Sequence, residues 1–117
     1  MRIVTAAAVA ALAVGLVACE ARGDDVRDAR EADAVGTVTS VSGAGDVMVV
    51  GFAPDPGDEY FEGTSFEFVE RGALETAAGE PATAADVAVG DRLEVWVDAC
   101  AESFPVQCPD PVGRLLS

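Results

Sequence analysis

Residues 92–98, Arg-Leu-Glu-Val-Trp-Val-Asp, carry the clearest strand pattern in the chain. Leu93, Val95 and Val97 alternate with charged residues or tryptophan, and this period of two is typical of a strand that buries one face. A turn with the sequence Val89-Gly-Asp91 comes directly before it. The stretch therefore predicts a β-sheet whose core lies on the side of Leu93.

Short β-rich segments separated by glycine and proline turns extend this pattern along the chain. The expected strands cover residues 34–41, 46–52, 64–70, 73–76, 92–98 and 112–116. One helical turn is expected over residues 83–87, with Thr83 as its N-cap. Five or six strands with one helical turn predict an all-β domain over residues 34–117, built as a small Greek-key barrel. An open β-sandwich is the alternative.

The N-terminal residues have the pattern of an export signal. Arg2 precedes an apolar run over residues 3–18, and Leu16-Val-Ala-Cys19 resembles a bacterial lipobox. Sixteen helical residues rise about 24 Å, which is short of a hydrocarbon core of about 30 Å. We therefore expect residues 1–18 to be a lipoprotein signal peptide. The alternatives are a transmembrane anchor and a signal that is cleaved without lipidation.

In this interpretation the mature chain begins at Cys19, whose thioether-linked acyl chains hold it to a membrane. The expected location is the extracytoplasmic side of the cell membrane or outer membrane. Residues 20–33 carry six acids and three arginines and few apolar side chains. We expect residues 19–33 to be a solvated tether that lifts the domain off the lipid surface, with a transient helical turn around Asp24–Glu31.

Composition excludes several function classes. The chain has 21 acidic and 7 basic residues, all of the latter arginine, and a net charge of −14. This charge repels phosphate backbones, so we expect no nucleic-acid partner. Because the chain contains no histidine, Ser–His and Cys–His nucleophile–base pairs are not possible. Because it contains no lysine, Schiff-base chemistry on a lysine is not possible either. We expect neither an enzyme nor a cofactor.

The three cysteines divide into one anchor and one pair. With Cys19 as lipid acceptor, Cys100 and Cys108 are left to form a disulfide in an oxidising compartment. Closing this short loop stabilises the fold by about 2–3 kcal/mol in the chain-entropy description. Two free thiols are the alternative.

Residues 89–98, followed by Ala101-Glu-Ser-Phe-Pro-Val-Gln107, resemble the C-terminal half of the YobA-like domain of unknown function. Members of that family are small bacterial lipoproteins. The resemblance extends to residues 34–52 in pattern only. It implies an OB-like barrel and brings no established activity. The chain departs from the family pattern by placing Cys100 and Cys108 around the Ser-Phe-Pro turn.

Several side chains are candidates for a ligand or partner face. Phe104, before Pro105, either caps the end of the barrel, which we expect, or is presented by a recognition loop. Trp96 is out of phase with its strand and lies either beneath the loop closed by the cysteines, as we expect, or exposed as a ligand platform. Tyr60 and Phe61 either join this face or begin the core of the next strand.

The loop between the second and third strands is strongly acidic. It contains Asp55, Asp58, Glu59 and Glu62, which we expect to be solvated. Calcium takes six to eight oxygen ligands, so a calcium site is the alternative. The sequence thus predicts a lipid-anchored binding or accessory module of the cell envelope, with an envelope protein or glycan as partner. The alternative is a calcium- or small-solute-binding lipoprotein that uses this loop.

Overall fold

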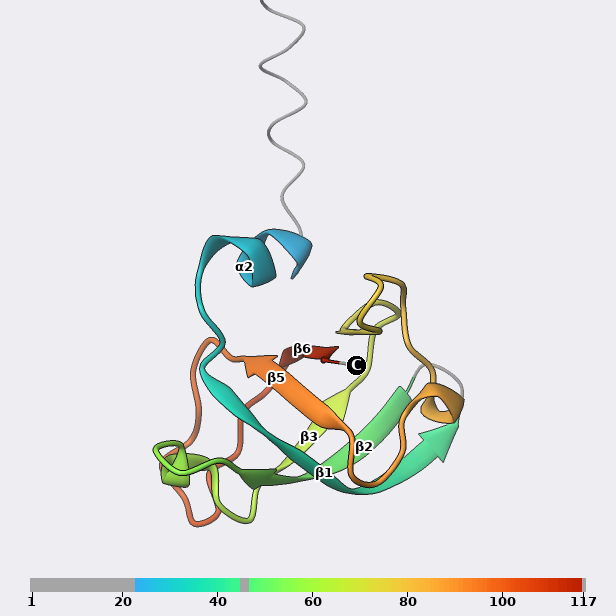
Figure 1. Cartoon of the computed structure of the whole chain (residues 1–117). Coiled ribbons are helices and arrows are strands. Elements are labelled where there is room, and N and C mark those ends of the chain that lie inside the picture. The colour runs from blue at the N-terminus through green and yellow to red at the C-terminus, as the bar shows by residue number, and fades with distance from the viewer. Residues whose placement is uncertain (1–22, 45–46, 117) are drawn as a thin grey trace, which may run out of the picture.

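The computed structural model describes residues 23–44 and 47–116 (Figure 1). The predicted signal peptide and Cys19 lie outside the described residues. Six strands form one sheet in the order β3-β2-β1-β5-β6-β4. Their bounds are β1 Ala34–Ala44, β2 Val47–Pro54, β3 Ser65–Phe68, β4 Leu74–Glu75, β5 Arg92–Trp96 and β6 Val112–Leu115. The helical segments are α2 Gly23–Ala29 and the 3-10 turns η2 Glu59–Phe61 and η3 Ala84–Asp86.

The prediction of a small all-β domain is confirmed. All neighbouring strands are antiparallel except β4 and β6, which are parallel. The expected helical turn is η3, where the Thr83 N–H donates to an Asp86 carboxylate oxygen at 2.8 Å. The finer assignment to an OB-like barrel stays a prediction.

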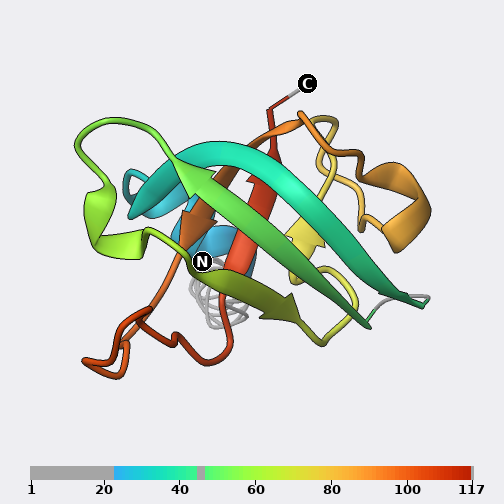
Figure 2. The same ribbon diagram turned by 90° about the horizontal axis from the view of Figure 1, so that it is seen from below.

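The two edges of the sheet are consecutive in the chain. β3 is one edge strand and β4 is the other, and only residues 69–73 separate them. The sheet must therefore curl until its edges approach, and Figure 2 shows the long strands bending around the interior. This curl places the segments that follow β2 and β5 at the same end of the molecule.

Alternation along the strands builds the core. In β3, Phe66 and Phe68 are buried, whereas Ser65 and Glu67 are exposed. The rings of Phe66 and Phe52 meet edge to face, with centroids 5.2 Å apart. Such aromatic pairs add to the stabilisation that apolar burial supplies. The other five strands also supply core side chains: Val38, Met48, Val50, Leu74, Leu93, Val95 and Leu115.

Helix α2 docks on the sheet through a buried arginine. The Arg27 side chain is 1% exposed, and its Nη1 donates to Glu75 Oε2 at 2.9 Å. Nε donates to the Gly113 carbonyl at 3.1 Å, and Nη2 donates to the carbonyls of Gly72 and Ala73 at 2.8 Å. The interpretation of this segment as a solvated tether is therefore wrong for α2, because polar contacts hold the helix where an apolar face is missing.

The segment after α2 also covers Trp96. The indole Nε1–H donates to the Arg30 carbonyl at 2.9 Å, and the residue is 3% exposed. The Arg114 guanidinium lies 5.8 Å from the ring centroid. Trp96 is therefore covered, as expected, and the alternative of an exposed ligand platform is wrong. The contact that covers its indole nitrogen comes from Arg30 and not from the disulfide between Cys100 and Cys108. This contact depends on the docking of the segment around α2 on the sheet, which the sequence did not predict.

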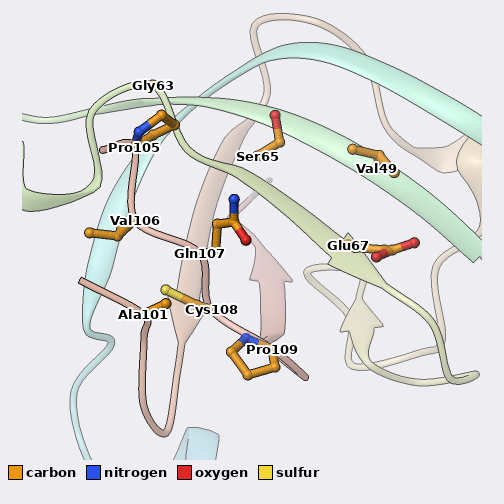
Figure 3. A pocket seen from close by; sticks show the side chains of 10 residues that line it. All are labelled: Val49, Gly63, Ser65, Glu67, Ala101, Pro105, Val106, Gln107, Cys108 and Pro109. Carbon is orange, nitrogen blue, oxygen red and sulfur yellow. The ribbon is translucent and has the colours of Figure 1, made fainter. Parts of the chain in front are cut away.

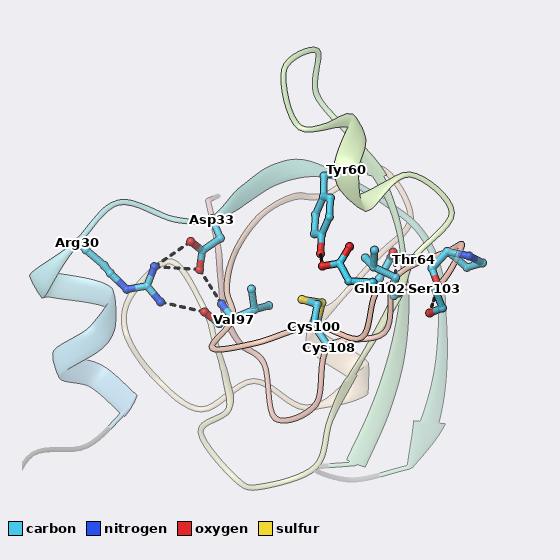
Figure 4. Close-up of a disulfide and its surroundings, with 11 residues drawn as sticks. Arg30, Asp33, Tyr60, Thr64, Val97, Cys100, Glu102, Ser103 and Cys108 are labelled. Carbon is cyan, nitrogen blue, oxygen red and sulfur yellow. Dashed lines mark hydrogen bonds and ion pairs between the residues drawn. A yellow bond between two sulfur atoms is a disulfide. The ribbon is translucent and has the colours of Figure 1, made fainter.

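A second polar cluster joins the α2–β1 connection to the end of β5. Arg30 Nη1 donates to Asp33 Oδ1 at 2.8 Å, and Nη2 donates to the Val97 carbonyl at 3.0 Å (Figure 4). Asp33 Oδ2 also accepts the Val97 N–H at 2.8 Å.

In the part of the chain that the structure describes, no helix is long and apolar enough to cross a bilayer.

Candidate functional site

The loop between β5 and β6 is closed by a disulfide between Cys100 and Cys108, as predicted (Figure 4). Its two arms also pair, because the Ala101 N–H donates to the Gln107 carbonyl at 2.7 Å. At the tip, Ser103 Oγ donates to the Pro105 carbonyl at 2.9 Å. Residues 100–108 are hereafter called the disulfide loop. A covalent link and internal hydrogen bonds thus restrict the conformations of this loop.

Phe104 lies at the tip of the disulfide loop and is 93% exposed. The expectation that it caps the barrel end is therefore wrong. Val106 fills that position instead, being 6% exposed, and its carbonyl accepts a hydrogen bond from Thr64 Oγ1 at 3.1 Å. Because the smaller valine enters the core, the phenylalanine is presented to solvent.

Tyr60 joins the η2 segment to the disulfide loop. Its Oη donates to Glu102 Oε2 at 2.9 Å, and half of the side chain is exposed (Figure 4). The hydrogen bond to the Glu102 carboxylate raises the pKa of Tyr60, and burial and the negative charge of Glu102 add to this effect. Phe61 is 5% exposed and packs against Phe66, so it belongs to the core and not to the partner face.

A groove of about 640 Å³ lies between the disulfide loop and strands β2 and β3 (Figure 3). Its strand side is formed by Val49, Gly63, Ser65 and Glu67. Its loop side is formed by Ala101 and by residues 105–109. Figure 3 shows the Gln107 side chain directed from the loop toward β3. The groove brings together segments that are far apart in the chain.

Three carboxylates of the acidic loop are engaged separately. Asp55 forms a two-point ion pair with Arg92, with oxygen–nitrogen distances of 2.8 and 2.6 Å. Asp58 Oδ2 accepts the Val35 N–H at 3.0 Å. Both carboxylate oxygens of Glu59 accept the Gly57 N–H, at 3.1 and 3.0 Å.

These contacts set the electrostatics of the acidic loop. The hydrogen bond from Arg92 lowers the pKa of Asp55, and the backbone N–H of Gly57 lowers that of Glu59. No three acids, histidines or cysteines of residues 23–44 and 47–116 are grouped so that they could hold a metal ion. Glu62, the fourth predicted calcium ligand, is exposed on this loop. The arrangement gives no support to the calcium alternative.

Sequence reasoning missed the groove and the docking of α2. Arg27 and Glu75 are a buried ion pair from segments 48 residues apart, and no local pattern marks them. The only signals were an arginine within an acidic run and an acid in a short apolar strand. Glu67 gave a signal as the outward residue of its strand, but the loop that faces it was not foreseeable.

Of the four residues predicted to form the partner face, only Tyr60 and Phe104 are exposed in the structure. The structure adds the groove beside the loop that carries Phe104. Figure 1 shows the loops that carry these residues at the end of the sheet away from α2. Comparisons of the chain with protein-family models, with curated proteins and with solved structures find no match.

Proposed function

We propose that this chain is a lipid-anchored binding module of the cell envelope that presents the disulfide loop and its groove to an envelope protein. The observation that carries the proposal is Phe104, an almost fully exposed aromatic residue on a loop that a disulfide closes. Aromatic side chains supply much of the energy of protein interfaces. A loop whose conformations are already restricted loses little entropy on binding, which favours affinity.

Two further features support this role. Tyr60 is half exposed and is tied to the same loop through Glu102, so a second exposed aromatic side chain is linked to the loop that carries Phe104. The lipobox-like residues 16–19 and the resemblance to the YobA-like lipoproteins point to an anchored, exported chain. Cys19 precedes α2 in the chain, and the loop between β5 and β6 extends to the end of the domain away from α2 (Figure 1). This arrangement supports presentation of the loop away from a membrane anchor.

The anchor is tested by mass spectrometry of the protein recovered from its native host. We expect the N-terminal peptide to begin at Cys19 and to carry acyl chains. A Cys19→Ser variant should lose them and leave the membrane fraction. An unmodified Cys19 on the membrane-bound wild-type protein would refute lipid anchoring.

The partner face is tested by photo-crosslinking in intact cells. A crosslinking amino acid placed at Phe104 should capture one defined envelope protein. The matched control is Val89, an exposed apolar residue on the turn before β5, where the same group should capture nothing specific. Equal products from both positions, or capture of glycan alone at Phe104, would contradict a protein-binding role for the loop.

A further inference from the structure

The two edge strands of the sheet differ in how they are covered. The outer side of β4 is occupied by residues 80–82, since the Ala82 N–H donates to the Leu74 carbonyl at 2.8 Å and Pro81 bridges to Glu75. Within the described residues, β3 pairs with β2 alone. Every second residue of an edge strand directs its N–H and C=O away from its neighbour, so β3 presents backbone groups that another strand can bind.

The groove lies along this edge. Gly63, Ser65 and Glu67, which are alternate residues, line its strand side (Figure 3). At one end the hydrogen bond from Thr64 Oγ1 to the Val106 carbonyl ties the disulfide loop to the start of β3. The groove therefore begins at this contact and follows β3 toward Glu67. Val49 of β2, the pairing partner of Glu67, also lines it. The strand side of the groove thus runs in the direction that a strand added to β3 would take.

The charge of the groove lining indicates what kind of segment it would bind. Of the described residues that line the groove, Glu67 is the only charged one, and it is exposed. Among the described residues, Glu67 takes part in no ion pair, whereas Arg27 and Arg114 pair with Glu75, Arg30 with Asp33, and Arg92 with Asp55. The opposite wall contains apolar Pro105, Val106 and Pro109. Because side chains of a strand alternate between two sides, this site fits a segment of alternating cationic and apolar residues.

We propose that the groove binds an extended cationic segment of a partner protein, which adds to β3 as a further strand with a lysine or arginine beside Glu67. The proposal rests on the proposed function and names the class of partner segment. Main-chain hydrogen bonds to β3 supply affinity, and the charge of Glu67 supplies selectivity.

The test uses the protein purified with its native N-terminus and a synthetic peptide of alternating lysine and valine. We expect peptide binding to slow hydrogen exchange of β3 amides that point away from β2 and to weaken with added salt. Glu67→Lys should weaken binding about tenfold or more. Glu80→Lys makes the same change in net charge at an exposed turn outside the groove, and it should alter affinity by about twofold at most.

Two outcomes with the unmodified peptide overturn the proposal. One is equal affinity of the wild-type protein and the Glu67→Lys variant, and the other is amide protection confined to residues outside β3. A peptide methylated on alternate backbone nitrogens should bind far more weakly, and its unimpaired binding would also exclude strand addition. Trp96 emission verifies that each variant is folded.

Failure of this inference is distinguishable from failure of the proposed function. A specific partner crosslinked at Phe104, together with no peptide binding at β3, would overturn strand addition and leave the module role intact. Peptide binding at β3 without any partner captured at Phe104 would overturn the proposed presentation of the loop and leave the β3 site intact.

Discussion

At the scale of single residues, Tyr60 shows how one hydrogen bond joins two loops. It is the only tyrosine of the chain, and its contact with Glu102 raises its pKa. Because the pKa is raised in the folded state, the contact stabilises the fold fully at pH values below the ordinary tyrosine pKa of about 10. This stabilisation is lost as the pH rises through the pKa of Tyr60 in the folded protein.

We predict that Glu102→Gln lowers the pKa of Tyr60 toward its ordinary value, because the variant removes the charged acceptor. Near-ultraviolet absorbance of the single phenolate measures this pKa. Glu62→Gln, which changes an exposed acid of the same region, should leave the pKa where it is. A pKa that is insensitive to Glu102→Gln would show that the two loops are not joined in solution.

Arg27 is the residue on which the docking of α2 depends. Removing one partner of a buried ion pair costs about 3–5 kcal/mol, because the other charge stays buried. The loss of stability in Arg27→Ala should lie near the lower end of this range, since Glu75 keeps a contact with Arg114 at 3.4 Å. Urea unfolding followed by Trp96 emission measures the free energy of unfolding.

The matched control for Arg27 is Arg30, whose side chain is 45% exposed. An exposed ion pair contributes about 1 kcal/mol or less, so Arg30→Ala should destabilise the fold much less than Arg27→Ala. Arg27→Ala should also shift the emission of Trp96 in the folded protein. The variant releases α2 from the sheet, and the Arg30 segment that follows α2 contacts the Trp96 indole. Equal losses in both variants would contradict the docked arrangement.

At the scale of elements, the disulfide loop combines a covalent and a polar constraint. Replacing both Cys100 and Cys108 by serine should lower the free energy of unfolding by about 2–3 kcal/mol, because the unfolded chain regains the entropy of the closed loop. Thermal unfolding with and without reductant measures the effect. Reductant should destabilise the wild type and leave the serine variant unchanged; the reverse result would show that the two cysteines are not paired.

The ion pair between Arg92 and Asp55 links β5 to the acidic loop. Because Arg92 lowers the pKa of Asp55, the pair stabilises the fold at pH values above the Asp55 pKa of the unfolded chain, about 4. This stabilisation is lost as the pH falls through the pKa of Asp55 in the folded protein. Asp55→Asn should therefore melt at a lower temperature than the wild type at neutral pH, and the difference should close in acid.

A series of melting temperatures from neutral to acidic pH checks the Asp55 prediction. Glu80→Gln, at an exposed acid on another turn, serves as its control and should show no such convergence. A constant difference between Asp55→Asn and the wild type at all pH values would show that the effect comes from packing and not from the charge pair.

At the scale of the whole molecule, the docked helix brings the domain close to its proposed anchor. Only residues 20–22 separate Cys19 from α2. Four residue-to-residue steps span about 14 Å at most. The expected lifting of the domain by a long tether therefore does not follow, because α2 and the residues after it lie against the sheet.

This geometry predicts strong energy transfer from Trp96, the only tryptophan, to a labelled lipid headgroup when the acylated protein is placed in vesicles. A flexible insertion after Arg22 should reduce the transfer by moving the sheet away from the surface. Transfer that is unaffected by the insertion would show that α2 does not fix the distance between the domain and the bilayer.

The sequence by itself determined the local features of this protein. The period of two placed Phe66, Phe68, Leu93 and Val95 in the core, and the cysteine count paired Cys100 with Cys108. Turn residues located the strands and the η3 turn closely. These features were predictable because each depends on neighbours within a few positions of the chain.

Only the tertiary structure decided how distant segments meet. It buried Arg27 against Glu75, covered Trp96 with the residues after α2, and turned Phe104 to solvent while Val106 entered the core. It also placed the disulfide loop opposite β3 and so formed the groove. Each of these outcomes depends on a contact between segments that are far apart in the chain, and local periodicity carries no information about such contacts.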